Sequence, residues 1–380
     1  GRVTSVSGDP IRGMQVRVLY QQIMNGETRW EERGSANTDD SGTFRLLDLV
    51  PGKYYVSTLV HPTRILSPGI RPFGENFDEV FPALYFSGSP DLSGATPVQV
   101  LPGQQAEADF SESPMKAYSV SGTAPEGLEG RMMFSLLDRE GYQTSNRIER
   151  RGNRFSFHDI VPGDYVLFVN ASSNGNEPMY GVAQVGVNNA DVDGVTVELS
   201  KAATIPVQVE WDKPPANTGT QPPCQVHLSP VAHNPWNNGY WSRSEMQDGQ
   251  QIQLLDRVMP GSYRVTVQST SQGYVAGLRS GQTDLIQNEL VVSPGAQPPA
   301  IQVSLHDGAA TLKGSVKAGS APVQRCFVLV LPDHNNVLET PMFGMASEFS
   351  LSGFAPGSYH VYAFSSLDGL EFRNREVMKK

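Results

Sequence analysis

The chain has 380 residues, a formal net charge of −10 at pH 7 and only 18% charged residues. This acidic balance argues against a nucleic-acid partner, because phosphate binding needs clustered Lys and Arg. It argues equally against a polybasic membrane anchor. No stretch approaches the ~18 apolar residues that a membrane-spanning helix needs, so no such span is expected.

Short alternating strands separated by turns are predicted from the N-terminus onward. Strand-like runs begin near residues 15, 131, 225 and 326, and period-2 strands follow at 106–110, 195–199 and 301–305. No long segment shows a helical apolar period. Many short strands with frequent turns predict an all-β chain. We expect four tandem small antiparallel β-sandwich modules, Ig-like or transthyretin-like with Greek-key connections, arranged in a rod.

A Pro-Gly-x-Tyr motif recurs four times at a spacing of roughly 100 residues, the size of a small domain. Pro favours the first central position of a type II turn and Gly the second, where φ is positive. A tyrosine that recurs in every module is structural, and its hydroxyl is expected to bond nearby backbone, as in a tyrosine corner. The predicted corner residues are Pro51, Gly52, Tyr54, Pro162, Gly163, Tyr165, Pro260, Gly261, Tyr263, Pro356, Gly357 and Tyr359.

The closing strands place the module boundaries. We expect modules at 1–113, 114–201, 202–306 and 307–380, the first with an aromatic insertion at about 60–86. The links between them are short, which favours a semi-rigid arrangement.

The first module resembles a known family. The resemblance rests on residues 83–86 and 95–103 and on Gly1, Asp9, Pro10, Gly13, Val16, Thr38, Asp39, Asp40, Gly42, Phe44, Pro51, Gly52 and Tyr54. This pattern resembles the carboxypeptidase regulatory-like domain, a transthyretin-type seven-stranded β-sandwich. The stretch at 83–86 and 95–103 is similar to large secreted or envelope proteins of acidobacterial type that string such modules together. The resemblance implies a fold more than a function, because such modules accompany enzymes, receptors, adhesins and fibres alike.

The sequence shows no catalytic constellation. The seven histidines are scattered without a zinc-binding spacing, and no Gly-x-Ser-x-Gly motif is present. We therefore predict no enzyme activity, no cofactor and no metal. The oxygen-rich turns at Asp39–Asp40 and 188–193 are ordinary turns, with weak calcium binding as the alternative. Cys224 and Cys326 lie in strand-like segments and are expected to be separate buried thiols, although a disulfide between modules is the alternative.

Two aromatic segments are candidate recognition sites. The first holds Trp236, Tyr240 and Trp241 in a polar, turn-prone run. Exposed rings flanked by amides bind sugars or anchor a protein partner, whereas the alternative is packing in a core or a seam between modules. The second is the insertion in the first module, which either contacts another protein or folds back over its own sandwich. Its aromatic residues are Phe73, Phe77, Phe81, Tyr85 and Phe86.

The last module is expected to lack its final strand. By the spacing in the second and third modules, that strand would fall beyond Lys380. An open sandwich leaves backbone N–H and C=O groups unpaired along an edge. Either the natural chain continues, or a strand from another subunit fills the gap by β-augmentation.

These features together predict a non-enzymatic structural protein, secreted to the cell surface or the extracellular space. We expect it to be an assembly or filament subunit whose partners are copies of itself or neighbouring subunits. The alternatives are an adhesin-like module that binds a glycan or a protein, and the stalk of a larger envelope protein.

Overall fold

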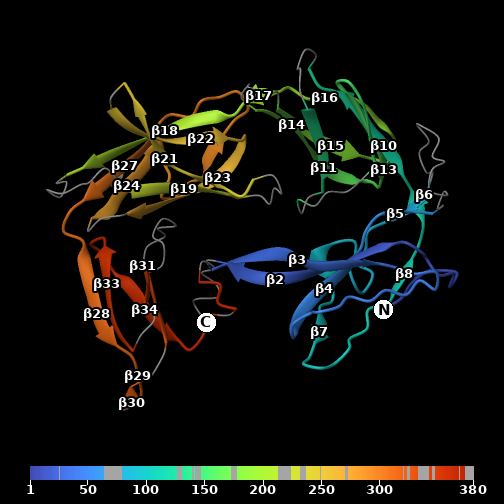
Figure 1. Ribbon diagram of the computed structural model, residues 1–380, viewed down its shortest axis with the longest axis horizontal. Helices are drawn as coiled ribbons and strands as arrows, with labels where there is room; N and C mark the ends of the chain where they lie inside the picture. The colour runs from blue at the N-terminus through green and yellow to red at the C-terminus, as the bar shows by residue number, and fades with distance from the viewer. Residues whose placement is uncertain are drawn as a thin grey trace.

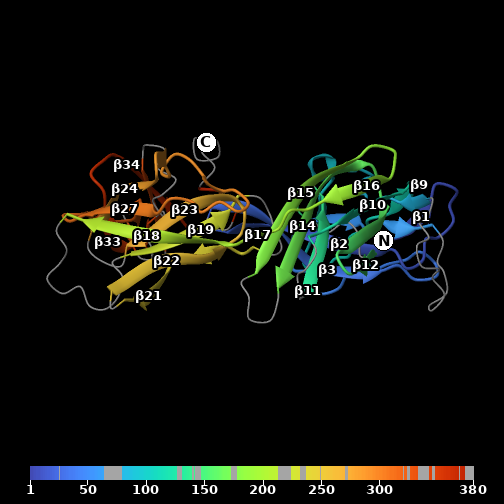
Figure 2. The same ribbon diagram turned by 90° about the horizontal axis from the view of Figure 1, so that it is seen from above.

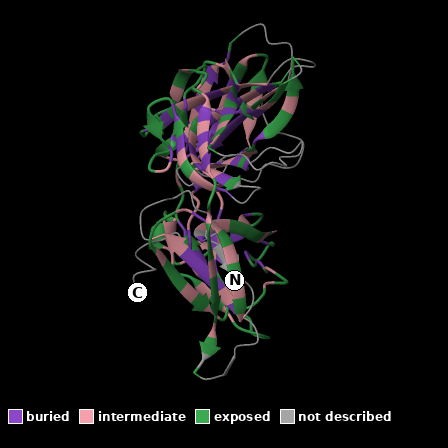
Figure 3. Ribbon diagram, turned by 90° about the vertical axis from the view of Figure 1, so that its left-hand side faces the viewer, coloured by how far each residue is buried: buried purple, intermediate pink, exposed green. Residues whose placement is uncertain are grey.

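The computed structural model describes residues 1–24, 26–63, 79–125, 131–138, 141, 147–172, 178–212, 224–231, 237–248, 250–269, 273–319, 321–322, 326–332, 342–344, 347–367 and 369–372. These residues form β-strands, turns and a single 3-10 turn at Leu92–Gly94. The predicted all-β sandwich class is confirmed. Four hydrophobic clusters each draw on one stretch of the chain, and we call each cluster with its sheets a unit, first to fourth. Buried residues lie between the layers of strands (Figure 3).

The first unit packs a four-stranded sheet against a two-stranded one. The larger sheet has the order β3–β2–β4–β7, with β2 at Gln15–Met24, β3 at Glu27–Asn37, β4 at Gly52–Thr58 and β7 at Val98–Val100. The smaller sheet pairs β1 (Val3–Ser5) with β8 (Phe110–Glu112). A separate small sheet, β5–β6–β9, joins His61–Pro62, Glu79–Phe81 and Met115–Lys116 beside the start of the second unit.

The second unit has two four-stranded sheets. One has the order β12–β13–β10–β16, with strands at Ile148–Arg151, Arg154–Ile160, Tyr118–Thr123 and Val192–Thr196. The other has the order β11–β14–β15–β17, with strands at Arg131–Leu137, Gly163–Ser172, Met179–Val187 and Ser200–Lys201. Alternate residues of β14 turn inward, so Tyr165, Leu167 and Val169 are buried on one face.

The third unit has the largest core. Its six-stranded sheet has the order β21–β22–β18–β27–β24–β25, at Arg243–Gln247, Gln250–Val258, Ala203–Trp211, Ile301–His306, Tyr274–Ser280 and Thr283–Asp284. The facing sheet has the order β20–β19–β23–β26, at Tyr240–Trp241, Cys224–Pro230, Gly261–Ser269 and Leu290–Val292.

The fourth unit is smaller. Its described strands are β28 (Ala310–Ser315) paired with β33 (Glu348–Phe354), and a sheet β32–β31–β34 at Met342–Gly344, Phe327–Pro332 and Tyr359–Phe364. A two-stranded ribbon, β29–β30, occupies Lys317–Ala318 and Ala321–Pro322. The buried residues of its cluster are Cys326, Val328, Val330 and Phe354.

In each of the first three units the opening strand pairs in parallel with a strand near the end of the same unit. These pairs are β1 with β8, β10 with β16 and β18 with β27. The other pairings between named strands in the described residues are antiparallel. The sandwich is therefore antiparallel except where the end of each unit returns to its beginning.

The four corners share one geometry, but it is not the type II turn expected from Pro-Gly. Three of the glycines have no positive φ, and Gly261 has a φ of 156°. The positive φ instead lies three residues before each proline. It is found at Asp48 (59°), Asp159 (63°), Arg257 (56°) and Gly353 (100°).

The glycine of each Pro-Gly-x-Tyr motif leaves space for a side chain and does not supply the positive φ. It stands beside the tyrosine ring two residues later, and a Cβ on Gly163 would approach the Tyr165 ring at 3.2–3.4 Å. Each tyrosine hydroxyl donates to the carbonyl four residues earlier. The acceptors are Val50 (2.7 Å), Val161 (2.7 Å), Met259 (2.7 Å) and Ala355 (2.8 Å).

The units follow an arc rather than the straight rod that short links suggested (Figures 1 and 2). The C-terminal end of the described chain returns to the tip of the β2–β3 hairpin (Figure 1). There Phe372 is buried, and its ring lies so close to Gly26 that a Cβ at this glycine would overlap it. Burial of this ring links the ends of the arc.

We predict that Tyr263→Phe destabilises the third unit more than Tyr54→Phe destabilises the first. The Tyr263 hydroxyl is buried, accepts from Asn237 Nδ2 at 2.8 Å and donates to Met259. Its loss leaves buried polar groups unsatisfied, at a cost of about 1–3 kcal/mol. Tyr54 bonds the carbonyl of exposed Val50, which water can satisfy instead. Urea unfolding of both variants measures the difference, and equal losses would contradict this account.

Candidate functional site

In the segment that holds Trp236, Tyr240 and Trp241, one described ring faces the core and the other faces the surface. Register pairs Leu228 with Tyr240 and His227 with Trp241, so adjacent residues of β20 face opposite sides. Tyr240 turns inward, where its hydroxyl accepts from Met259 N at 3.2 Å and its ring meets Tyr263 edge-on. Trp241 turns outward, is 55% exposed and stacks on His227 with a centroid distance of 4.2 Å. Trp236 lies outside the described residues.

The aromatic insertion folds back onto the first unit where it is described. Phe81 and Tyr85 are buried, and Phe86 packs edge-on against Phe110 at 6.0 Å. These three rings are therefore not exposed for a partner protein, and Phe81 and Phe86 pack in the apolar core of the first unit. Phe73 and Phe77 lie outside the described residues. Strand β6 of the insertion pairs with β9, so it supports the junction with the second unit.

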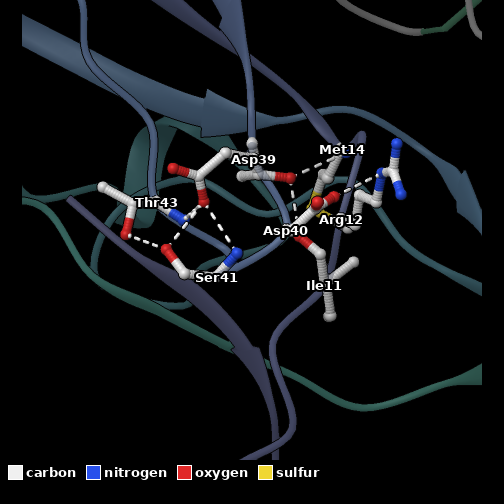
Figure 4. A network of polar contacts seen from close by, with 8 residues as sticks. Ile11, Arg12, Met14, Asp39, Asp40, Ser41 and Thr43 are labelled. Atoms are coloured by element: carbon white, nitrogen blue, oxygen red, sulfur yellow. Dashed lines mark hydrogen bonds and ion pairs between the residues drawn. The ribbon is translucent and has the colours of Figure 1, made fainter.

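The two oxygen-rich turns direct their carboxylates to neighbouring donors, and Figure 4 shows the first of these turns. Asp39 Oδ1 accepts from Ser41 N at 2.8 Å, Ser41 Oγ at 2.7 Å and Thr43 N at 2.9 Å, and these bonds lower its pKa. Asp40 pairs with Arg12 at 2.8 Å. In the second turn, Asp191 and Asp193 accept from strand β10. Hydrogen bonds within the turn at Asp39, an ion pair at Asp40 and hydrogen bonds from β10 at Asp191 and Asp193 account for the four carboxylates.

The described residues offer no ready site for metal or thiol chemistry. No group of three or more His, Cys, Asp or Glu gathers among them. Cys224 and Cys326 are both buried and unbridged. Burial raises the pKa of the Cys224 thiol to about 12, which keeps it protonated and unreactive. No helix in the described part of the chain is long and apolar enough to cross a membrane.

Glu112 is a buried carboxyl that the sequence analysis did not identify. It ends β8 with 0% exposure, and its Oε1 accepts from Thr58 Oγ1 at 2.9 Å while Oε2 has no partner. Burial raises its pKa to about 7. The two-residue period of the strand could have identified Glu112 as buried. Glu112 follows Phe110 by two residues and therefore lies on the same inward face.

The fourth unit has two strand edges that are paired in the other units. In the first three units the opening strand has a parallel neighbour, but β28 pairs only with β33 among the described residues. The corner strands β4, β14 and β23 each have neighbours on both sides. Their counterpart β34 pairs only with β31 in the part of the chain that the structure describes.

The apolar face beside these edges is also uncovered. Val56, Leu167 and Val265 lie two residues after the corner tyrosine and are buried. At the same position in the fourth unit, Val361 is 49% exposed. The surrounding residues Leu312, Phe349 and Leu351 are only partly buried. Among the described residues, the unpaired edges of β28 and β34 beside exposed Val361 are thus the most conspicuous candidate interaction site.

Comparisons with known proteins yield structural resemblances but no family. No family model matches the chain, and no curated protein matches it. Among solved structures, a Streptococcal ancillary pilin is 10% identical, with 66% of this chain and 91% of that chain covered and a TM-score of 0.17. The minor pilin GBS52 of Streptococcus agalactiae is 14% identical, with 56% and 89% covered and a TM-score of 0.21.

A major pilin protein of Streptococcus pyogenes is also 14% identical, with 51% of this chain and 98% of that chain covered and a TM-score of 0.18. All three TM-scores are low. Neither the fold nor the function of this chain therefore rests on these resemblances.

We predict that Glu112 makes the first unit less stable as pH rises from about 4.5 to 7. The folded carboxyl holds its proton up to about pH 7, whereas the unfolded one loses it near the ordinary value of 4.5. The stabilisation is complete below the unfolded pKa and is lost as pH rises through the folded one, a change of roughly 3 kcal/mol. Urea unfolding across this range measures it.

Glu112→Gln should remove this pH dependence, because the amide is neutral throughout. Glu107→Gln is the matched control, since Glu107 is exposed on the approach to the same strand. A wild-type pH profile in Glu112→Gln would refute the assignment.

Proposed function

We propose that this protein is a non-enzymatic structural subunit of a cell-surface or extracellular assembly, with a filament as its extended form. The open fourth unit carries the proposal. Strands β28 and β34 present unpaired edges within the described residues, and Val361 exposes the apolar face between the sheets. Backbone groups along such an edge pair readily with a strand from another chain.

The repeat supports a specific mode of assembly by strand addition. In the complete units, one strand runs parallel to the opening strand and another runs antiparallel to the corner strand. A donated segment that supplied both strands would complete the fourth unit in the same way. The acceptor edge differs from any donor surface, so the contact is head-to-tail and generates a filament when the rotation does not close.

Three finer proposals accompany this function. The units are of the carboxypeptidase regulatory-like kind, within a secreted or envelope protein of acidobacterial type, as the motif residues around Asp39 and Tyr54 suggest. The four modules have the boundaries 1–113, 114–201, 202–306 and 307–380. The four corner motifs hold the modules in shape and take no part in binding.

Blocking the exposed face of the fourth unit tests the proposal. The full chain should form higher-order species with increasing concentration, measured by light scattering after gel filtration and by electron microscopy. Val361→Lys should leave it monomeric, because an ammonium group cannot be buried there without a large desolvation cost. Val291→Lys is the matched control, since Val291 is exposed on β26 of the complete third unit. A wild-type chain that stays monomeric at high concentration would overturn the proposal.

A second candidate function is recognition of a glycan or a partner protein through Trp241. The observation that favours it is the exposed indole, held in place by the stacked His227 ring. A rigid exposed aromatic face loses little entropy on binding and suits a sugar ring or a hot-spot contact.

Trp241→Ala should abolish such binding and leave the circular dichroism spectrum unchanged. A glycan array and binding to immobilised cell-surface proteins provide the readout. Trp30→Ala is the control, because Trp30 packs on Tyr55 in another unit. Equal binding by wild type and Trp241→Ala would rule out this site.

A further inference from the structure

The Pro-Gly-x-Tyr corner of each unit lies at the end where the chain enters that unit. The strand before the corner runs antiparallel to the opening strand, so its last residues face the first residues of the opening strand. Three such pairs are Ile160 with Tyr118, Val258 with Ala203 and Phe354 with Ala310. In the first unit, Phe44 and Gly1 exchange backbone hydrogen bonds in the same orientation. From the second unit onward, each corner therefore points toward the preceding unit.

The seam between the first and second units shows what such a corner meets. A cleft of about 900 Å³ lies there, and Val161 and Pro162 of the second unit's corner line one side of it. The other side holds Gln15, Ser57 and Leu59, at the ends of β2 and β4 that lie away from the first unit's own corner. We call these three positions, and their counterparts in the other units, the wall. A corner at this seam therefore faces the wall of the unit before it.

The seam between the second and third units repeats this arrangement. Asn170 stands five residues after its corner tyrosine, as Leu59 does, and pairs with Tyr180 of β15. Burial raises the pKa of Tyr180, and the Arg257 guanidinium at the third unit's corner opposes this rise. A charge acts on a phenol in this way only when the two groups are close together. The third unit's corner therefore lies against the wall end of the second unit.

The corner of the first unit differs because its apolar residues are exposed. Leu47 and Val50 are each 65% exposed, and Leu101 is 46% exposed. Leu101 lies beside the corner, since it follows β7, which pairs with β4 as far as Gly52. At the position of Val50, the third unit has Met259, which is 4% exposed. The first unit's corner thus offers to solvent an apolar surface of the kind that marks an interaction site.

The wall of the fourth unit is aromatic. Its three positions hold Phe327, Tyr362 and Phe364, where the first unit has Gln15, Ser57 and Leu59. All three rings are only partly buried. Tyr362 and Phe364 stack with their centroids 6.1 Å apart, on the face of β34 opposite Val361. The fourth unit therefore presents apolar rings at the positions that contact a corner elsewhere in the chain.

We propose that the corner of the first unit binds the wall of the fourth unit in a second copy of this chain. The inference rests on the proposed assembly function, and it adds a contact that orients successive copies. The apolar corner and the aromatic wall are complementary, because their contact removes apolar surface on both sides from water. Corner and wall are different surfaces, so each copy offers one of each and the contact repeats head to tail. Copies then stack as units do within one chain.

A mixed cross-linking experiment with the full chain tests the proposal. Val50→Cys and Phe364→Cys are purified separately, combined, and treated with a short bis-maleimide that joins two nearby thiols. The mixture should yield a covalent dimer that neither variant yields alone, because only the mixture brings a new thiol to each side of the contact. Wild type sets the background, since Cys224 and Cys326 are both buried.

Val6→Cys is the matched control for Val50→Cys. Val6 is also 65% exposed in the first unit, but it lies beyond the end of β1 that points away from the corner. Its mixture with Phe364→Cys should yield only the background. Absence of the dimer from Val50→Cys with Phe364→Cys would contradict the proposal. A link within single chains carrying both substitutions, unchanged on dilution, would also contradict it, because the wall would then belong to the same copy.

The contact and the assembly are measured separately. Light scattering of wild type reports assembly, whereas the covalent dimer reports the contact of corner with wall. Higher-order species without this dimer would leave the proposed function standing and remove only the contact. Val50→Asp should raise the concentration needed for assembly by about tenfold or more, because a carboxylate is costly to bury against aromatic rings. Val6→Asp should leave that concentration unchanged.

Discussion

A parallel pairing of the opening strand with a strand near the end of the unit closes each of the first three sandwiches. It satisfies the backbone of the opening strand on both sides and covers the core at the point where the chain enters it. In the third unit this pair joins five residues of β18 to five of β27, with Ile301, Val303 and Leu305 fully buried. The described residues of the fourth unit have no such pair. That unit accordingly has a small buried cluster and an exposed Val361.

The tyrosine corners carry a second constraint that repeats through the chain. A positive φ three residues before the proline turns the backbone, and the tyrosine hydroxyl then secures the loop by bonding the carbonyl just before the proline. Because the geometry is local, it tolerates sequence change at the turning residue. Asp48, Asp159, Arg257 and Gly353 all adopt it. A strained αL residue costs about 1–2 kcal/mol, which the corner hydrogen bond and the buried ring offset.

Period and repetition were sufficient to predict the fold class from sequence. Alternation located β11, β19 and β27, and the Pro-Gly-x-Tyr motif located the four corners. The turn type was wrong because propensity assigns the positive φ to glycine, whereas here the glycine makes room for the tyrosine ring. The arc was also not predictable, since it depends on contacts such as Phe372 on Gly26 between residues far apart in the chain. For the candidate sites, composition located the aromatic rings, but only register separated exposed Trp241 from half-buried Tyr240.

The polar groups that break the local pattern gather where units meet. Glu112 is an inward-facing carboxyl on a strand that otherwise buries Phe110, and Asp159 is a buried charge at a position exposed in two other units. Apolar residues at these two positions would serve a purely structural role better, because buried ionisable groups cost free energy unless they are paired. Repetition of one sandwich therefore gives two kinds of surface here. Among the described residues, the fourth unit leaves strand edges without a neighbouring strand, and a cleft with charged residues in its lining lies between the first and second units.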